Sequence, residues 1–185
     1  MEMDKLSRML MRIMLQNAGA EYGALVFAND HGWTVEAYGT AEEQHIESLP
    51  LEEAEHLVPS AVIEYTARTN EAVILHDAAA SSMFGRNDYI RRKSNKSVLC
   101  LPIVYQNSLI CQIYMENNLS TGVFDEKRLD VLKLLSSQCA ISIANAKLYM
   151  GMQSLKNSLE EQVQQRTRAL EKSMQATSEA LAETT

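Results

Sequence analysis

The last third of the chain constrains the fold most, because it predicts a helix that is longer than a domain of this size can cover. Asp125 can cap the start of the helix, and Phe124 and Leu129 are placed as a hydrophobic staple around that cap. From there on, the only residue that disfavours a helix is Gly151. A helix from Asp125 to about Leu170 would be roughly 70 Å long, whereas a domain of about 150 residues has a radius of gyration of about 15 Å. The far half of this helix therefore needs a second partner.

Two apolar stripes along this helix predict two different contacts. In one stripe, steps of three and four residues alternate, which is the a/d spacing of a coiled coil, and we predict that it is the seam of a parallel homodimer. This dimer seam consists of Leu134, Ile141, Asn145, Leu148, Met152, Leu155 and Leu159, with Val131 and Gln138 at the same spacing. The second stripe can pack on a sheet and consists of Leu129, Leu132, Ser136, Cys139 and Ile143. The alternative is a single helix surrounded by solvent.

The spacing of the seam changes beyond Leu159. The aligned residues there approach an 11-residue repeat, which unwinds a left-handed supercoil. They are Leu159, Val163, Arg166, Leu170, Met174, Thr177 and Leu181. Polar seam residues such as Asn145 weaken the seam but can fix its register. We expect the segment with the changed spacing to be the element that switches between two states.

Shorter patterns before the long helix predict an α+β domain with a mainly antiparallel sheet of about six strands. Strands are expected at Ala24–Ala28, Trp33–Tyr38, Ala72–Leu75, Val98–Val104 and Leu109–Asn117, with the first two in a hairpin, and an edge strand or irregular excursion within 41–58. Helices are expected at Pro59–Thr69, in short pieces within 77–94, and along an apolar stripe that stops near Gly19 and consists of Leu6, Met9, Leu10, Ile13 and Met14. We assign residues 1–150 to the domain and residues 151–185 to the C-terminal helix.

Composition and spacing argue against several classes of protein. The net charge of −7 argues against a nucleic-acid binder, which would carry a basic stripe. No apolar window approaches the roughly 20 residues of a membrane span, and no CxxC or HxxxH spacing supports a metal site. Three cysteines, an odd number, in a chain without a signal peptide indicate a reducing, cytoplasmic setting.

Several short motifs within about residues 1–150 match a known family of domains. They are Asn70-Glu71, Asp88-Tyr89-Ile90, Lys96 to Ile103, Tyr114 to Leu119, Gly122, Phe124, Arg128-Leu129, Val131-Leu132, Leu134 to Gln138 and Asn145 to Tyr149. On these residues the domain resembles GAF domains, the relatives of PAS domains that sense small molecules, and the resemblance is closest to the GAF module of hybrid sensor histidine kinases. Residues 159–167 look like the signalling helix that joins such modules to a kinase, with Gln165 where the family usually has glutamate.

The resemblance implies a six-stranded sheet with helices on both faces, followed by a coiled-coil helix. It also implies a non-catalytic sensory module of a two-component histidine kinase, with a kinase domain C-terminal to these residues in the full-length protein. The sequence ends within the predicted helix, which suggests that it is a piece of a longer chain. Cys111, Cys139 and His76 depart from the glycine, alanine and aspartate that are usual in the family. The motifs for cyclic-nucleotide binding and bilin attachment are absent, so cofactor and ligand stay unknown.

GAF domains bind ligands between one face of the sheet and the helices above it. On the strand Leu109–Asn117, we assign Leu109, Cys111, Ile113 and Met115 to an apolar face beneath the first and last helices, and Ile110, Gln112, Tyr114 and Glu116 to a more polar face. The polar face is the better candidate for the floor of a ligand pocket. The segment that would cover it supplies aromatic residues that could stack on a ligand and arginines that could bind an anion. The predicted pocket residues are Phe84, Tyr89, Arg91, Arg92, Gln112, Tyr114 and Glu116. The alternative is that they are ordinary core and surface residues.

Two further hypotheses concern the cysteines and the pocket. The chain could be a redox sensor or an enzyme similar to the GAF-type free-methionine-sulfoxide reductases. With a two-residue turn, Cys100 and Cys111 would share one face of a hairpin at about 7 Å or more, which is long for a disulfide. Both cysteines, and Cys139, are expected in strands or a helix rather than in exposed loops, which disfavours catalysis. The last hypothesis is a dimerisation scaffold with an empty pocket.

Overall fold

A single six-stranded sheet organises the domain, with strand order β3-β2-β1-β6-β5-β4 and every neighbouring pair antiparallel. This arrangement confirms the predicted α+β class and the six-stranded antiparallel sheet, and the hairpin expected at the start of the domain is formed by β1 and β2. The strands are β1 (Tyr22–Asn29), β2 (Gly32–Gly39), β3 (Gln44–Pro50), β4 (Val73–Leu75), β5 (Ser97–Tyr105) and β6 (Ser108–Asn117).

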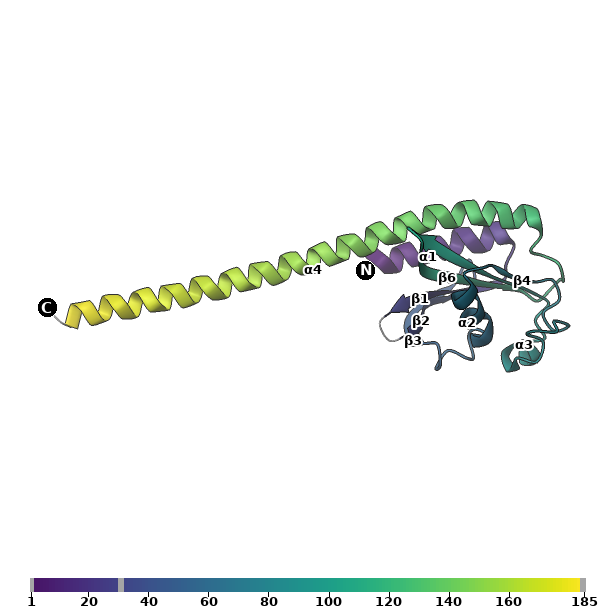
Figure 1. The fold of residues 1–185 in the computed structure, drawn as a ribbon, viewed down its shortest axis with the longest axis horizontal. Helices are drawn as coiled ribbons and strands as arrows, with labels where there is room; N and C mark the ends of the chain where they lie inside the picture. The colour runs from purple at the N-terminus through teal and green to yellow at the C-terminus, as the bar shows by residue number, and fades with distance from the viewer. Residues whose placement is uncertain (1, 30–31, 184–185) are drawn as a thin grey trace. The chain divides into compact units, whose positions relative to one another are not determined.

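The computed structural model describes residues 2–29 and 32–183 (Figure 1). The chain up to Ala144 forms one compact unit, and the chain from Asn145 onward forms a second. One helix, α4 (Glu126–Glu183), contributes residues to both units. Leu181, the last residue of the predicted seam, lies outside the residues whose side chains are described.

Helices cover both faces of the sheet within the first unit (Figure 1). Helix α1 (Glu2–Ala18) and the first turns of α4 pack on one face, where their apolar side chains form a common core with Leu25, Leu99 and Ile113. Helices α2 (Ser60–Thr69) and α3 (Asp88–Lys93) cover the other face, over a second core that contains Tyr114. The sheet therefore separates two cores of different composition, because successive side chains of a strand point to opposite faces.

The buried stripe of α1 differs by one position from the predicted one. Met9 was expected to face the core but is 60% exposed, whereas Met11 and Leu15 are fully buried together with Met14. The predicted positions follow i, i+3, i+4 spacing. The apolar face of a helix can be wider than this stripe, and here it also includes Met11 and Leu15. The helix is thus rotated so that its core stripe centres on Leu10, Met11, Met14 and Leu15.

The β5–β6 hairpin contains a bulge that the sequence pattern did not reveal. Its two-residue turn, Gln106 and Asn107, has positive φ at both positions, as a type I′ turn requires. The register then shifts, so that Val104 pairs with Leu109 but Ile103 pairs with Cys111, which leaves Ile110 as an extra residue. The assignment of Ile110 to the polar face of β6 was therefore wrong, since this side chain packs against the core beneath α1 and α4.

The same bulge corrects the predicted relation between two cysteines. Cys100 pairs with Tyr114, not with Ile113 as a regular hairpin would require. Cys100 therefore lies in the core beneath α2 and α3, whereas Cys111 lies in the core beneath α1 and α4. The expectation that Cys100 and Cys111 share a face was wrong, and neither cysteine forms a disulfide.

The start of α4 is fixed to the end of α1. The backbone N–H of Arg128 donates to the Asp125 carboxylate at 2.8 Å, which confirms Asp125 as the N-cap. The guanidinium of Arg128 donates to the carbonyl of Ala18 at 2.7 Å, where α1 ends in unpaired carbonyls. Beyond this cap, the predicted second stripe of α4 is buried against the sheet, with Leu132 and Ile143 fully covered.

Replacing Gly19 by alanine tests this junction. Gly19 has a φ of +66°, and a Cβ added there would overlap the guanidinium of Arg128. Left-handed strain costs about 1–2 kcal/mol, and loss of a hydrogen bond from a charged group costs about 1.5–3 kcal/mol. We expect Gly19→Ala to lower the free energy of unfolding by about 3 kcal/mol in urea denaturation.

The matched control is Gly122→Ala. Gly122 has a similar φ of +68°, but no atom lies within 4 Å of an added Cβ. This variant should lose only the strain contribution of about 1–2 kcal/mol. Equal losses in the two variants would show that the Arg128 contact does not contribute to stability.

Candidate functional site

The face of β6 beneath α2 and α3 carries three polar side chains that are almost completely buried. Gln112 and Tyr114 are fully buried, and Glu116 is 2% exposed. Glutamate is rarely buried unless it is paired and hydrogen-bonded. This group of side chains is therefore the best candidate for a functional site in the domain.

Glu116 is the centre of a hydrogen-bond network between β6 and α3. The hydroxyls of Tyr89 and Tyr114 donate to Oε2 of Glu116 at 2.9 and 2.7 Å. The ammonium of Lys93 and the side-chain amide of Asn118 donate to Oε1 at 3.4 and 3.2 Å. The carboxylate thus receives four donors, which compensate for the loss of water.

The two phenols act as neutral donors in this network. Burial, and after it the charge of Glu116, raises the pKa of Tyr89 and of Tyr114 above the ordinary value of a phenol. The Tyr22 hydroxyl, at the start of β1, has its pKa raised for the same two reasons. At neutral pH all three rings therefore keep their protons.

The predicted pocket residues do not all come together. Phe84 is buried and packs edge-on against Tyr65, with ring centroids 5.6 Å apart. Arg91 pairs with Asp88 at 3.8 Å on the surface, and Arg92 donates to the backbone carbonyls of Asp88 and Glu55. Among the described residues, no hydrogen bond joins either arginine to Gln112, Tyr114 or Glu116.

Two surface hollows lie beside α3. The larger one has a volume of about 540 Å³ and is lined by Glu55, Asp88, Arg91 and Arg92, so that acidic and basic groups balance. A smaller hollow of about 100 Å³ brings Arg92 to the same opening as Tyr89. The arginines therefore border the outside of the site, and the glutamate occupies its inside.

The sequence analysis missed the cation of the site, Lys93. Its ammonium donates to the Tyr89 hydroxyl at 2.8 Å and lies 4.7 Å from the ring centroids of both Tyr22 and Tyr89. One signal was present, because Lys93 follows Tyr89 by four residues and so shares its face of a helix. The contact with Glu116 had no such local signal.

Cys100 and Cys139 are poorly suited to thiol chemistry. Cys100 is fully buried, donates from its thiol to Oε1 of Gln112 at 3.4 Å, and has its pKa raised to about 12 by burial. Burial also raises the pKa of Cys139. Because the thiolate is the reactive form, these environments disfavour both redox sensing and a cysteine-dependent reductase.

The described residues contain no group of three or more histidine, cysteine, aspartate or glutamate side chains that could hold a metal ion. Within the same residues, no helix has the length and apolar character needed to cross a membrane.

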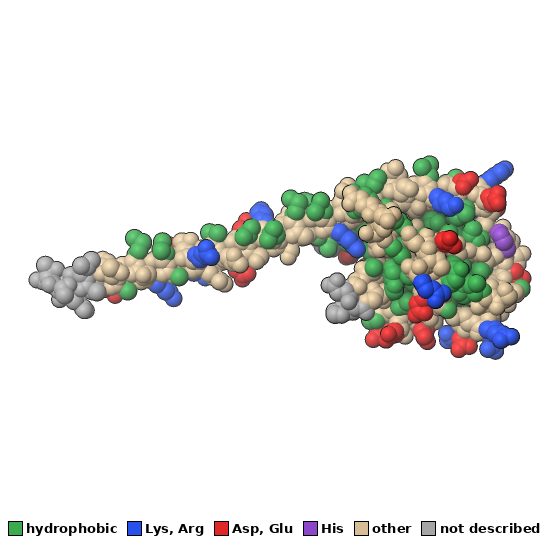
Figure 2. All heavy atoms as spheres, viewed as in Figure 1, with side chains coloured by type: hydrophobic (Ala, Val, Ile, Leu, Met, Phe, Trp, Pro, Cys, Tyr) green, Lys and Arg blue, Asp and Glu red, His purple; other side chains and the backbone are tan. Residues whose placement is uncertain are grey.

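A second candidate site is the exposed apolar row on α4. Every apolar residue of the predicted dimer seam is exposed, from 44% at Ile141 to 68% at Leu134, and Asn145 is exposed as well. Figure 2 shows hydrophobic side chains at intervals along the helix, separated by charged ones. A row of exposed leucine and methionine side chains at heptad spacing is typical of a surface that binds another helix.

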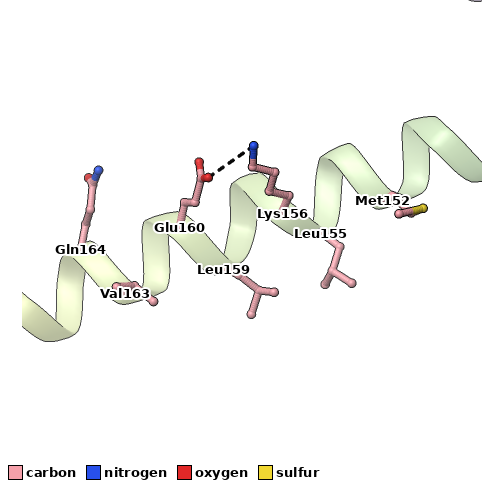
Figure 3. A pocket seen from close by; sticks show the side chains of 7 residues that line it. All are labelled: Met152, Leu155, Lys156, Leu159, Glu160, Val163 and Gln164. Atoms are coloured by element: carbon pink, nitrogen blue, oxygen red, sulfur yellow. Dashed lines mark ion pairs between the residues drawn. The ribbon is translucent and has the colours of Figure 1, made fainter.

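Figure 3 shows the middle of this row in detail. Leu155 and Leu159 project from one side of α4, whereas Lys156, Glu160 and Gln164 project from the other, and Lys156 pairs with Glu160 at 3.7 Å. Seven side chains between Met152 and Gln164, four of them apolar, line an open hollow of about 560 Å³ along the helix. The helix is thus amphipathic in this segment, with a distinct apolar side.

Comparison with known proteins identifies the domain. The model of the GAF domain family matches residues 2–143. The chain belongs to the GAF domain family.

Relatives of this GAF domain are histidine kinases. It is 41% identical over 96 residues to hybrid signal transduction histidine kinase G of Dictyostelium discoideum, a match that covers 52% of the chain and 3% of the kinase. It is 25% identical over 155 residues to the peroxide stress-activated histidine kinase mak3 of Schizosaccharomyces pombe, covering 82% of the chain and 6% of that kinase. The chain therefore spans only a small part of the length of these relatives.

Solved structures support the fold independently. The GAF domain of PixJ from Thermosynechococcus elongatus, in its blue-light absorbing form, superposes with a TM-score of 0.61 at 12% identity, over 80% of this chain and 88% of that one. At this level of identity the similarity concerns the fold alone.

Thiol labelling of the GAF domain tests the burial of its cysteines. We expect N-ethylmaleimide at pH 8 to alkylate Cys100 at least about 100-fold more slowly in the folded protein than in guanidinium, because the reactive thiolate is both buried and scarce. Intact mass spectrometry counts the labelled thiols, and the unfolded protein, which should take up three labels, is the control. Prompt labelling of Cys100 in the folded domain would contradict this environment.

Alkaline pH should destabilise the domain, because buried acids are held protonated. The unfolded chain loses protons from cysteine and tyrosine above a pH of about 9–10, while the raised pKa values of Cys100, Tyr89 and Tyr114 keep these groups protonated in the fold. Their contribution to stability is therefore complete below pH 9 and is lost as the pH rises above it. Each group adds up to about 1.4 kcal/mol per pH unit to this loss.

Urea denaturation at pH values from 7 to 11 measures the effect. We expect a nearly constant free energy of unfolding up to about pH 8.5 and a steady fall above pH 9. The free energy of unfolding of the Cys100→Ala variant should fall less steeply, because this variant lacks one of the groups with a raised pKa. A free energy that stays constant up to pH 11 would rule out the protonated, buried state of these side chains.

Proposed function

We propose that this GAF domain is the sensory module of a longer histidine kinase and that two copies pair in parallel through α4. A small ligand binds on the polar face of β6, and α4 relays the bound state to a kinase domain that follows in the full-length protein. The module itself is not catalytic. Its kinase relatives and its cysteines, none of which forms a disulfide, support a cytoplasmic setting.

The observation that carries this proposal is the exposed apolar row of α4. Its leucine and methionine side chains are more than half exposed, including Leu148 at 66% and Met152 at 62%. At about 1.5 kcal/mol for each buried side chain, six apolar seam residues from each of two chains would gain about 18 kcal/mol. Association costs about 4–15 kcal/mol, so a paired state is favoured.

The polar member of the seam supports a parallel arrangement. Asn145 is exposed between Ile141 and Leu148, at the same heptad spacing. A single asparagine at such a position fixes the register of a parallel dimer, because each amide then finds the same amide on the other chain. A parallel pair also brings two following kinase domains to the same end of the coiled coil.

The relay needs an element with two arrangements, and the segment from Leu159 to Met174 suits it. Its apolar side chains, including Val163 and Leu170, stay exposed but depart from the heptad spacing. A local change towards an 11-residue repeat unwinds the supercoil, so two packings of this segment can differ little in energy. A small rotation of α4 would then favour one packing over the other.

Sizing of the chain tests the pairing. We expect multi-angle light scattering at tens of micromolar to give a dimer for the full chain and a dimer at least about tenfold weaker for a version that ends at Tyr149, which lacks Met152, Leu155 and Leu159. The double variant Leu155→Asp/Leu159→Asp should be monomeric, because burial of two carboxylates per chain is too costly.

The matched control is Asn157→Asp/Gln164→Asp. It adds the same two charges to exposed positions that lie outside the row, and Figure 3 places Gln164 on the side opposite to Leu155 and Leu159. This variant should remain dimeric. A monomeric full chain, or equal weakening in both double variants, would refute pairing through the row.

A further inference from the structure

The buried charge of Glu116 depends on one flexible cation. Among the described residues, Lys93 is the only cationic side chain that contacts this carboxylate, and its side chain is 38% exposed. The nitrogen–oxygen distance is 3.4 Å, longer than the 2.7–2.9 Å of a strong charge-assisted hydrogen bond. The other three donors are neutral, so they satisfy the oxygens but do not neutralise the charge.

The ammonium of Lys93 occupies an aromatic site. It lies 4.7 Å from the ring centroids of Tyr22 and Tyr89 and within hydrogen-bond distance of the Tyr89 hydroxyl. Aromatic faces together with a carboxylate form the usual recognition site for organic cations. The Tyr22 hydroxyl is buried and has no hydrogen-bond partner, so one polar group beside the site is unused.

Lys93 is well placed to leave this site. It is the last residue of α3, which is only six residues long, and Ser94 after it has a left-handed backbone with a φ of 50°. A lysine reaches inward through a four-carbon chain that has many rotamers, and holding it in place costs side-chain entropy. A free ammonium of a small ligand could replace it without leaving Glu116 unpaired.

We propose that the site formed by Glu116, Tyr89 and Tyr22 binds the primary ammonium group of a small molecule, and that Lys93 occupies the site in the absence of this ligand. This inference rests on the proposed sensory function and names the chemical class of its ligand. The ligand ammonium donates to Glu116 and stacks against the two tyrosine rings, while Lys93 turns out to solvent. Anionic ligands are disfavoured here because the buried group is itself negative.

The site connects to the C-terminal end of α1 and to the segment that precedes α4. Asn118, which donates to Glu116, also accepts from Asn95 and donates its backbone N–H to Glu21. The neighbouring Asn117 donates to the carbonyl of Gly19, where α1 ends. Displacement of Lys93 therefore changes the partners of Glu116, to which Asn118 of the segment between β6 and α4 is hydrogen-bonded, and this gives the ligand a route to the relay.

Chemical rescue in the full chain tests the inference, with methylammonium chloride as the probe. Lys93→Met keeps the length of the side chain but removes its charge, and we expect it to lower the Tm by about 4 °C. Methylammonium at tens of millimolar should restore at least half of this loss, and sodium chloride at the same concentration should not. Titration should show that methylammonium binds Lys93→Met at least about tenfold tighter than the wild type, because the internal competitor is gone.

Two variants serve as controls. Lys93→Met/Glu116→Gln removes both charges and should show no rescue. Lys96→Met removes the same charge from a neighbouring exposed lysine, whose ammonium donates to the carbonyl of Leu119, and it should behave like the wild type. If Lys93→Met does not fold, ligand-observed NMR of methylammonium with the wild type and with Glu116→Gln replaces the rescue, and binding should be lost in the variant.

The inference is wrong if methylammonium stabilises Lys93→Met no more than sodium chloride does, or if the double variant is rescued equally. In the NMR version, equal binding to the wild type and Glu116→Gln overturns it. Light scattering of the same samples separates this failure from failure of the proposed function. Dimers without methylammonium binding would reject only the ligand class, whereas monomers would reject the relay.

Discussion

The structure depends on one helix that has to satisfy two apolar surfaces at once. In its first turns, α4 buries Leu132, Cys139 and Ile143 against the sheet, while Leu134 and Ile141 remain exposed on another face of the same helix. Burial of the first set fixes α4 to the domain, and the cap at Asp125 and the contact of Arg128 with Ala18 fix where it begins. Because the two sets share one rigid backbone, any rotation that repacks the inner face also moves the outer one.

The two cores of the domain differ in composition. The core beneath α1 and α4 is apolar, whereas the core beneath α2 and α3 contains Gln112 and Glu116. A buried ion pair adds little to stability compared with an apolar core, so stability alone does not explain the polar side chains of the second core. The sheet thus separates the core that holds α4 from the core in which we propose that a ligand binds.

Most elements of this fold were predictable because their signals are local. The cap at Asp125, the inner stripe of α4, the β1–β2 hairpin and the helix after Pro59 each follow from residues that are close in sequence. The exceptions depend on contacts across the sheet. A bulge leaves no compositional mark in the β5–β6 hairpin, so the side of Ile110 was misassigned.

The site was predictable only in part, for the same physical reason. The alternation of β6 correctly placed Gln112, Tyr114 and Glu116 on one face, since strand periodicity is a local property. The partner of the buried carboxylate was not found, because Lys93 and Glu116 meet through the fold and not through a motif. The arginines of α3 looked more suitable as ligand contacts, but both remain at the surface.

The extra residue in the β5–β6 hairpin has a consequence for how such chains can vary. Deleting Ile110 would remove the bulge and leave a regular hairpin, because Val104 would still pair with Leu109 and Ile103 with Cys111. Cys100 would still lie opposite Tyr114, so the buried carboxylate and its tyrosines would keep their side of the sheet. Loss of this one residue would therefore preserve the network around Glu116, whereas loss of a residue from the regular part of β6 before it would turn the later side chains to the opposite face.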